Sequence, residues 1–154
     1  MAEQIGFIGL GIMGKPMAGH LQKGGHELFL HDLVDLPKEL LSGGATKCSS
    51  GKDVAENAEI VIIMVPDTPH VDAVLFGENG VAEGLSKGMT VIDMSSISPI
   101  ETKEFAKKIN DIGCDYLDAP VSGGEVGAKN AAPTIMVGGG QKGFDAIKLL
   151  FDLM

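Results

Sequence analysis

The sequence has no tryptophan, a single tyrosine and two cysteines among its 154 residues. With so few aromatic side chains, a surface that stacks nucleic-acid bases is poorly supported. The cysteines, Cys48 and Cys114, lie far apart and outside any Cys-x-x-Cys pattern. We therefore expect free, buried thiols rather than a disulfide or a metal-binding pair. The four histidines show no metal-ligand spacing, so no metal site is predicted.

Positive charge is also scarce, with 12 basic against 21 acidic residues and a formal net charge of −9. This balance would repel nucleic-acid backbones and anionic membranes, so neither is an expected partner. Long hydrophobic runs are missing as well. The longest, from Ile60 to Val65, is far too short to cross a bilayer, and no basic segment followed by an apolar one opens the chain. A cytoplasmic location is expected.

What the sequence does contain is enough apolar material, 44%, for one domain with a sizeable core. Its most informative stretch begins with Ile5, Phe7 and Ile8, whose bulky side chains are typical of a short buried strand. A glycine loop follows directly, and then Met13, Met17 and Leu21 recur at helical spacing. Two glycines end this predicted helix. Strand, loop and helix thus follow one another without a spacer.

The loop has the pattern Gly-x-Gly-x-x-Gly, which suits a dinucleotide pyrophosphate at the start of a helix. The first glycine permits a tight turn, the second lets the backbone approach the phosphates, and the third lets helix and strand pack closely. In a chain with 22 glycines the alternative is a tight turn without a ligand. The loop consists of Gly9, Leu10, Gly11, Ile12, Met13 and Gly14.

A second predicted strand, from Glu27 to His31, ends at Asp32. Dinucleotide-binding folds place an acidic residue at this position to bind the hydroxyls of the adenosine ribose. A carboxylate there would repel a 2′-phosphate, and Leu33 offers no positive charge to reverse that preference. NAD is therefore expected over NADP. The alternative is an ordinary loop aspartate.

Further predicted strands and helices alternate along the chain, with a turn-rich region from Gly77 to Gly88. The strands run from Thr46 to Cys48, Ile60 to Val65, Thr90 to Met94, Asp115 to Ala119 and Thr134 to Val137. Two of the helices run from Pro37 to Leu41 and from Lys52 to Asn57. Three more begin after a cap at Thr68, at Pro99 and at about Lys142. The helix that begins at Pro99 is expected to face inward with Phe105, Ile109 and Ile112. Such alternation predicts an α/β, Rossmann-type, doubly wound fold with a mainly parallel sheet.

Unusual segments follow several of the predicted strands: the glycine loop, Asp32, Val65-Pro66, Ser96 and Ser122-Gly123-Gly124. In an open parallel sheet, ligands bind outside the carboxyl ends of the strands. The repeated placement of these segments at such ends favours a common binding edge over isolated turns.

Four motifs in this order resemble the β-hydroxyacid dehydrogenases. They lie at Gly6 to Met17, Met64 to Pro66, Asp93 to Pro99 and Asp118 to Gly124. The resemblance covers the chain from Gly6 onward. It implies hydride transfer between a nicotinamide cofactor and a small β-hydroxyacid or its semialdehyde, of the 2-hydroxy-3-oxopropionate type. Alternatives are 3-hydroxyisobutyrate and succinate semialdehyde; 6-phosphogluconate is less expected, because Leu33 follows Asp32 and the sequence has no basic cluster for a sugar phosphate. A non-catalytic cofactor-sensing or oligomerisation module is the alternative of another class.

The resemblance also implies roles for individual residues. The glycine loop and Asp32 would hold NAD, Val65 and Pro66 would pass beside it, and Ser96 would lie near the nicotinamide ribose. Ser122, Gly123 and Gly124 would position the carboxylate and hydroxyl of the substrate, because consecutive glycines leave amides exposed to an anion. The alternative for this last segment is a flexible turn.

Two departures from the family bear on these expectations. Ala131-Ala132-Pro133 stands where the family has a Gly-Thr-Leu run, which puts the start of the last strand in doubt. The family's acid/base lysine lies on a long helix of an all-helical second domain, beyond Met154. Residues 1–154 are thus expected to form the NAD(P)-binding domain of a longer enzyme, homo-oligomeric when intact, and to be inactive alone.

Overall fold

The computed structural model describes residues 4–10, 14–32, 36–65, 68–95, 99–118, 121–122 and 134–135. For residues 68, 99, 118, 121, 122, 134 and 135 it describes the backbone alone. The main strands are β1 (Gln4–Ile8), β2 (Glu27–His31), β3 (Thr46–Lys47), β4 (Ile60–Ile63), β5 (Thr90–Asp93) and β6 (Asp115–Asp118). The helices are α1 (Gly14–Lys23), α2 (Lys38–Ser42), α3 (Gly51–Asn57), α4 (Thr68–Phe76), α5 (Val81–Gly84) and α6 (Pro99–Asp111).

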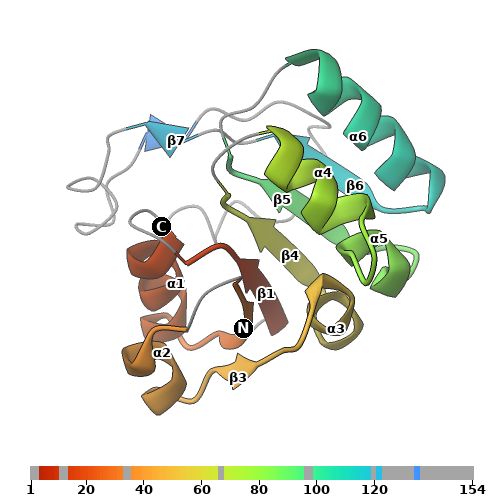
Figure 1. Cartoon of the computed structure of the whole chain (residues 1–154). Helices are drawn as coiled ribbons and strands as arrows, with labels where there is room; N and C mark the ends of the chain where they lie inside the picture. Colours follow the sequence, from red (N-terminus) through yellow and green to blue (C-terminus); the bar gives the residue numbers. More distant parts are fainter. Residues whose placement is uncertain are drawn as a thin grey trace.

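The six main strands form one parallel sheet in the order β3-β2-β1-β4-β5-β6 (Figure 1). The order reverses between β1 and β4, which makes their carboxyl ends the switch point where ligands bind in such folds. A separate antiparallel pair joins β7 (Val121–Ser122) to β8 (Thr134–Ile135). The predicted Rossmann-type, mainly parallel architecture is confirmed.

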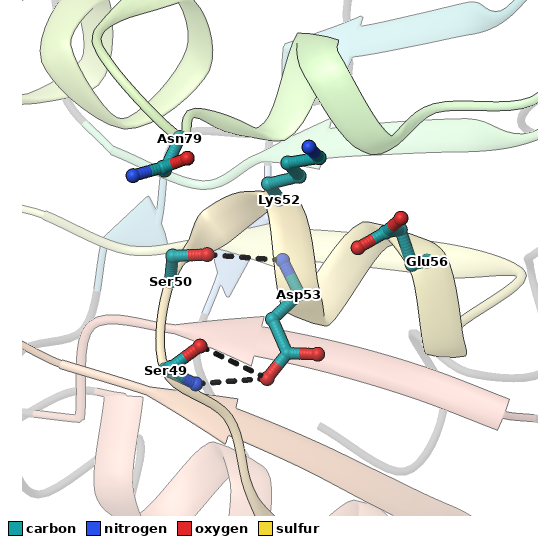
Figure 2. A pocket seen from close by; sticks show the side chains of 6 residues that line it. All are labelled: Ser49, Ser50, Lys52, Asp53, Glu56 and Asn79. Carbon is teal, nitrogen blue, oxygen red and sulfur yellow. Dashed lines mark hydrogen bonds between the residues drawn. The ribbon is translucent and has the colours of Figure 1, made fainter.

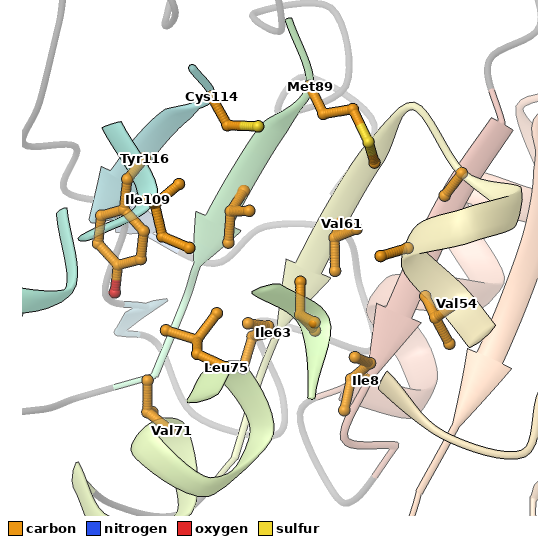
Figure 3. Packing of buried hydrophobic residues seen from close by; sticks show 14 of the residues in the cluster. Ile8, Val54, Val61, Ile63, Val71, Leu75, Met89, Ile109, Cys114 and Tyr116 are labelled. Carbon is orange, nitrogen blue, oxygen red and sulfur yellow. The ribbon is translucent and has the colours of Figure 1, made fainter. Parts of the chain in front are cut away.

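Helices cover both faces of the sheet because alternate strand residues point to opposite sides. On one face, α1 and α2 contribute Met17, Leu21 and Leu40 to a core with Phe7 and Ile62. On the other face, strand residues pack beneath α3, α4, α5 and α6. Figure 3 shows this packing for α3, α4 and α6. That second core includes Ile8, Val54, Val61, Ile63, Val71, Leu75, Ile109 and Tyr116. Burying each large apolar side chain stabilises the fold by about 1.5–3 kcal/mol.

Several strand and helix ends differ from the predicted ones by one residue, and three local predictions differ further. Ile112 was expected to face inward from α6, but the helix ends at Asp111 and Ile112 is 37% exposed. It lies on the turn that Gly113, with φ +95°, makes into β6, and this turn carries it away from the core. The turn-rich region after α4 contains the short helix α5, and β4 ends two residues before Val65. The helix predicted from Lys142 lies outside the described residues.

A close contact between β1 and α3 gives a stability prediction. A Cβ added at Gly6 would overlap Cγ1 of Val54, a fully buried and rotationally stiff side chain. We expect Gly6→Ala to lower the free energy of unfolding by about 1–3 kcal/mol, measured by urea denaturation. Because Val54→Ala would create space at the same point, the double variant should lose less stability than the two single losses added together.

The matched control is Gly19→Ala on α1, where an added Cβ would lie 3.9 Å from its nearest neighbour, Cδ2 of Leu40. There the change should raise stability by about 0.5–1 kcal/mol, since alanine favours helix. Equal losses at both glycines, or strict additivity of Gly6→Ala with Val54→Ala, would contradict the packing argument.

Candidate functional site

The carboxyl ends of β1 and β2 are tied together by a predicted site residue. Asp32 follows β2, and its Oδ2 accepts a hydrogen bond of 2.7 Å from the backbone N–H of Leu10, which follows β1. Next to it, the N–H of Gly9 donates to the carbonyl of His31 at 3.2 Å. The glycine loop and Asp32, predicted from the sequence to act together, therefore lie in direct contact.

Gly9 and Gly14 have separate steric reasons to be glycine. Gly9 has φ +95°, and a Cβ there would overlap the carbonyl oxygen of Met64, which follows β4. A Cβ on Gly14, the first residue of α1, would overlap the carbonyl oxygen of Gly9. The chain thus leaves β1 and enters α1 where it also meets the segment after β4. This agrees with the sequence-based roles of a tight turn and of close helix–strand packing.

The start of α1 is suited electrostatically to an anion. Its first turn carries no acidic side chain, so the partial positive charge of the helix terminus is not offset from within the helix. Nζ of Lys15, in the same turn, lies 3.5 Å from Oε1 of Glu39, on α2. The pKa of Glu39 is lowered, first by a hydrogen bond to its own backbone and then by Lys15. Lys15 is half exposed.

Beyond β1 and β4, a buried polar network continues along the same edge. The N–H of Val65 donates to Oγ of Ser95 at 2.9 Å, and the N–H of Ser95 donates to Oδ1 of Asp93 at 2.9 Å. Oδ2 of Asp93 accepts from the hydroxyl of Tyr116, on β6, at 2.7 Å. Burial raises the pKa of Asp93 above 3.8, and the bonds from Tyr116 and Ser95 oppose this rise. Hydrogen bonds and packing contacts therefore connect the carboxyl ends of neighbouring strands all the way from β2 to β6.

The described residues include part of the predicted site. Gly9, Leu10, Gly14, Asp32 and Val65 are brought to one edge of the sheet. Ser122 lies in β7, where only its backbone is described. The remaining predicted site residues lie outside the described residues; they are Gly11, Ile12, Met13, Pro66, Ser96, Gly123 and Gly124.

No individual role was predicted from the sequence for Asp93, Ser95 or Tyr116, although the motif from Asp93 to Pro99 includes the first two. The signal for Asp93 was a charged residue inside the apolar run of β5, where a carboxylate is costly to bury without partners. Its partner on β6 could not be read from spacing, since 23 residues separate Asp93 from Tyr116.

A surface hollow of about 430 Å³ lies elsewhere, where the start of α3 meets the α4–α5 connection (Figure 2). Three of its six lining residues, Ser49, Ser50 and Asp53, form hydrogen bonds at the α3 cap. Oγ of Ser50 accepts from the N–H of Asp53 at 3.1 Å, and the carboxylate of Asp53 accepts from the N–H of Ser49 at 2.9 Å. No predicted cofactor residue lines this hollow, so we assign it to helix capping.

Cys48 and Cys114 are free and buried, as predicted. Burial raises the pKa of the Cys48 thiol to about 11, which makes it a poor nucleophile. In the described ranges no group of three His, Cys, Asp or Glu side chains is arranged to hold a metal ion. None of the described helices has the length and hydropathy needed to span a bilayer.

The raised pKa of Asp93 gives a pH prediction. The folded state holds the Asp93 proton more tightly than the unfolded state, so the stability contributed by Asp93 increases as pH falls through the folded-state pKa. Relative to Asp93→Asn, which cannot titrate there, the unchanged chain should gain in Tm as pH is lowered from about 7 toward about 4. Thermal melts followed by circular dichroism measure this difference. A difference in Tm that stays constant with pH would contradict the expectation.

Comparison with known proteins agrees with this architecture. Over residues 4–154 the chain matches the protein family described as the NAD binding domain of 6-phosphogluconate dehydrogenase. It is 54% identical over 151 residues to 2-hydroxy-3-oxopropionate reductase of Escherichia coli (strain K12), covering 98% of this chain and 52% of that protein. Mitochondrial 3-hydroxyisobutyrate dehydrogenase of Homo sapiens is 41% identical over 151 residues, covering 97% of this chain and 45% of that protein.

Among solved structures, the chain superimposes on 3-hydroxyisobutyrate dehydrogenase of Mycobacterium tuberculosis, studied with L-serine, with a TM-score of 0.87. The two are 30% identical, and the match covers 100% of this chain and 52% of that one. The chain thus spans about half the length of the relatives it matches. The predicted resemblance to hydroxyacid dehydrogenases is confirmed: a glycine loop at the switch point of a parallel sheet and a family match over residues 4–154 place the chain in the family of NAD-binding domains described for 6-phosphogluconate dehydrogenase.

Proposed function

We propose that the chain binds NAD along the carboxyl edge of its sheet, as part of an oxidoreductase. In the intact enzyme, hydride would pass between the nicotinamide and a small β-hydroxyacid or its semialdehyde. The observation that carries the proposal is the bond from the N–H of Leu10 to Asp32, beside the sheet's switch point. This bond places a carboxylate next to a glycine loop that opens a helix.

The glycine loop, residues 9–14, is the proposed pyrophosphate site. Its support is the start of α1, which has no acidic residue in its first turn and packs so closely on Gly9 that Gly14 has no room for a side chain. Unpaired N–H groups at such a helix start bind phosphate oxygens. Leu10, Gly11, Ile12 and Met13 would contribute backbone to this site.

Asp32 is the proposed ligand of the adenosine ribose. An ionised carboxylate can accept about four hydrogen bonds, so its bond from Leu10 is compatible with bonds from two ribose hydroxyls. The same charge would repel the 2′-phosphate of NADP, which favours NAD.

The nicotinamide and substrate would lie on the other side of the glycine loop, above β4, β5 and β6. Val65, Pro66 and Ser96 are proposed to pass beside the nicotinamide half, supported by the contact of Val65 with Ser95. Ser122, Gly123 and Gly124 are proposed to hold the substrate. Their support is the start of β7 at Val121, three residues after the carboxyl end of β6.

The proposed substrate is of the 2-hydroxy-3-oxopropionate type, with 3-hydroxyisobutyrate and succinate semialdehyde as alternatives. The support is the 54% identity to the Escherichia coli reductase. We also propose that the acid/base lysine belongs to a helical second domain outside residues 1–154, and that the intact enzyme is a cytoplasmic homo-oligomer. The support for a second domain is that the chain spans about half the length of its relatives.

Titration of the chain with NADH and NADPH tests the cofactor assignment. NADH should bind more tightly, and Asp32→Ala should weaken NADH by on the order of 10- to 100-fold, which corresponds to losing charged hydrogen bonds worth about 1.5–3 kcal/mol. Fluorescence of bound NADH and NADPH measures both affinities. Equal affinity of the unchanged chain for the two cofactors would overturn the assignment of NAD.

Asp32→Asn is the matched control. Its amide oxygen can still accept the N–H of Leu10, so the loop keeps its tether while the negative charge is lost. The affinity ratio of NADH to NADPH should fall in both variants, because the repulsion of the 2′-phosphate is lost in each. A ratio unchanged in Asp32→Asn would show that the Asp32 charge does not select the cofactor.

Turnover tests the placement of the lysine. If the acid/base group lies outside residues 1–154, the chain should bind NADH yet reduce 2-hydroxy-3-oxopropionate at least about 10²–10⁴-fold more slowly than the Escherichia coli reductase, the range that acid–base catalysis contributes. Loss of NADH absorbance follows both reactions under the same conditions. Comparable rates would place the acid/base group within this chain.

A further inference from the structure

Three polar side chains are buried beneath the carboxyl ends of β5 and β6. Asp93 is 0%, Ser95 1% and Tyr116 5% exposed. Removing a carboxylate from water costs several kcal/mol unless hydrogen bonds compensate, and apolar residues often fill such positions with equal or greater stability. Stability alone therefore gives little reason for a carboxylate here. A better reason is the segment of backbone that its hydrogen bonds hold in place.

The hydrogen bonds of these side chains form a series that runs from Tyr116 through Asp93 and Ser95 and ends at the backbone of Val65. The ladder of β4 ends at Ile63, and the N–H of Met64 still donates to the carbonyl of Ile8 at 2.9 Å. The next N–H, that of Val65, is instead taken by Oγ of Ser95 at 2.9 Å. A side chain, rather than the sheet, sets the direction of the chain as it leaves β4.

Ser95 is in turn fixed from below. Its N–H donates to Oδ1 of Asp93 at 2.9 Å. Tyr116 holds the other oxygen, Oδ2, at 2.7 Å from β6. Both oxygens of Asp93 thus have donors, one from the segment just after β5 and one from β6, which leaves the carboxylate little freedom to turn.

Val65 also lies against the glycine loop. A Cβ built on Gly9 would lie 3.1 Å from Cγ1 of Val65, so the direction of the chain at Val65 affects the space beside the loop. In the sheet order, Asp32 after β2 lies on one side of this loop, and Val65 and Ser95 lie on the other. A dinucleotide with its adenosine at Asp32 would extend its nicotinamide half toward Val65.

We propose that Asp93, Ser95 and Tyr116 are positioning residues for the nicotinamide half of the cofactor site, and act by holding the backbone of Val65. This rests on the proposed function. Asp93 and Tyr116 do not touch the cofactor in this scheme; they orient Ser95, which holds the peptide that passes beside it. The adenosine half, held by Asp32 and the start of α1, does not depend on them.

The experiment compares two probes on the same chain. NADH occupies both halves of the site, whereas ADP supplies only the adenosine and the diphosphate. Ser95→Ala should weaken NADH by about 3- to 10-fold, the loss expected for one hydrogen bond, and should change ADP affinity by less than about twofold. Tyr116→Phe keeps the ring and removes one donor, so it should shift NADH in the same direction by a smaller factor.

Ser50→Ala is the matched control. Its hydroxyl likewise accepts a backbone N–H, that of Asp53 at 3.1 Å, but it caps α3 and has no bond to the network of Asp93, Ser95 and Tyr116. We expect it to lower Tm while leaving the ratio of NADH to ADP affinity unchanged. This control separates loss of stability from loss of positioning.

The outcomes distinguish the inference from the function on which it rests. A selective loss of NADH in Ser95→Ala and Tyr116→Phe supports the inference. If the unchanged chain binds both probes and the variants lose both equally, or lose neither, the three residues are structural and the inference is wrong. If the unchanged chain binds neither probe, the proposed function is wrong, and the inference fails with it.

Discussion

The site depends on how closely the backbone packs at the end of β1. The carbonyl of Gly9 occupies the space that a Cβ on Gly14 would need, and the carbonyl of Met64 occupies the space that a Cβ on Gly9 would need. These two contacts bring the start of α1 and the exit of β4 to the same point. A side chain at either glycine would separate them, because backbone atoms cannot yield as a flexible side chain can. This close packing is why the ends of β1 and β4 and the start of α1 share one edge of the sheet.

Negative side chains at this edge are paired with nearby donors, although the whole chain has a net charge of −9. Three carboxylates among the described residues near this edge have donors: Asp32 accepts from Leu10, Glu39 pairs with Lys15, and Asp93 accepts from Tyr116 and Ser95. The start of α1 carries no acidic side chain in its first turn. An anion can therefore approach the helix terminus even though the protein as a whole repels negative charge.

Periodicity and turn chemistry predicted most of the fold. Continuous apolar runs such as Ile60–Ile63 identify strands buried on both faces, and the glycine loop identifies the start of α1. Prediction failed where tertiary contacts decide. Ile112 has helical spacing but lies on a turn, and α5 is too short to show a period. The bond between Asp93 and Tyr116 crosses strands, so only the assembled sheet reveals it.

The bonds along the edge also determine when the site comes into being. They join residues 22, 30 and 23 positions apart, from Leu10 to Asp32, Val65 to Ser95 and Asp93 to Tyr116. None can form within a single helix or hairpin, and each closes a loop at an entropic cost. A nascent chain that has not yet reached Tyr116 lacks the last of these partners. Any nucleotide that selects the finished edge would therefore stabilise the native chain by mass action and leave its unfolded precursors unaffected.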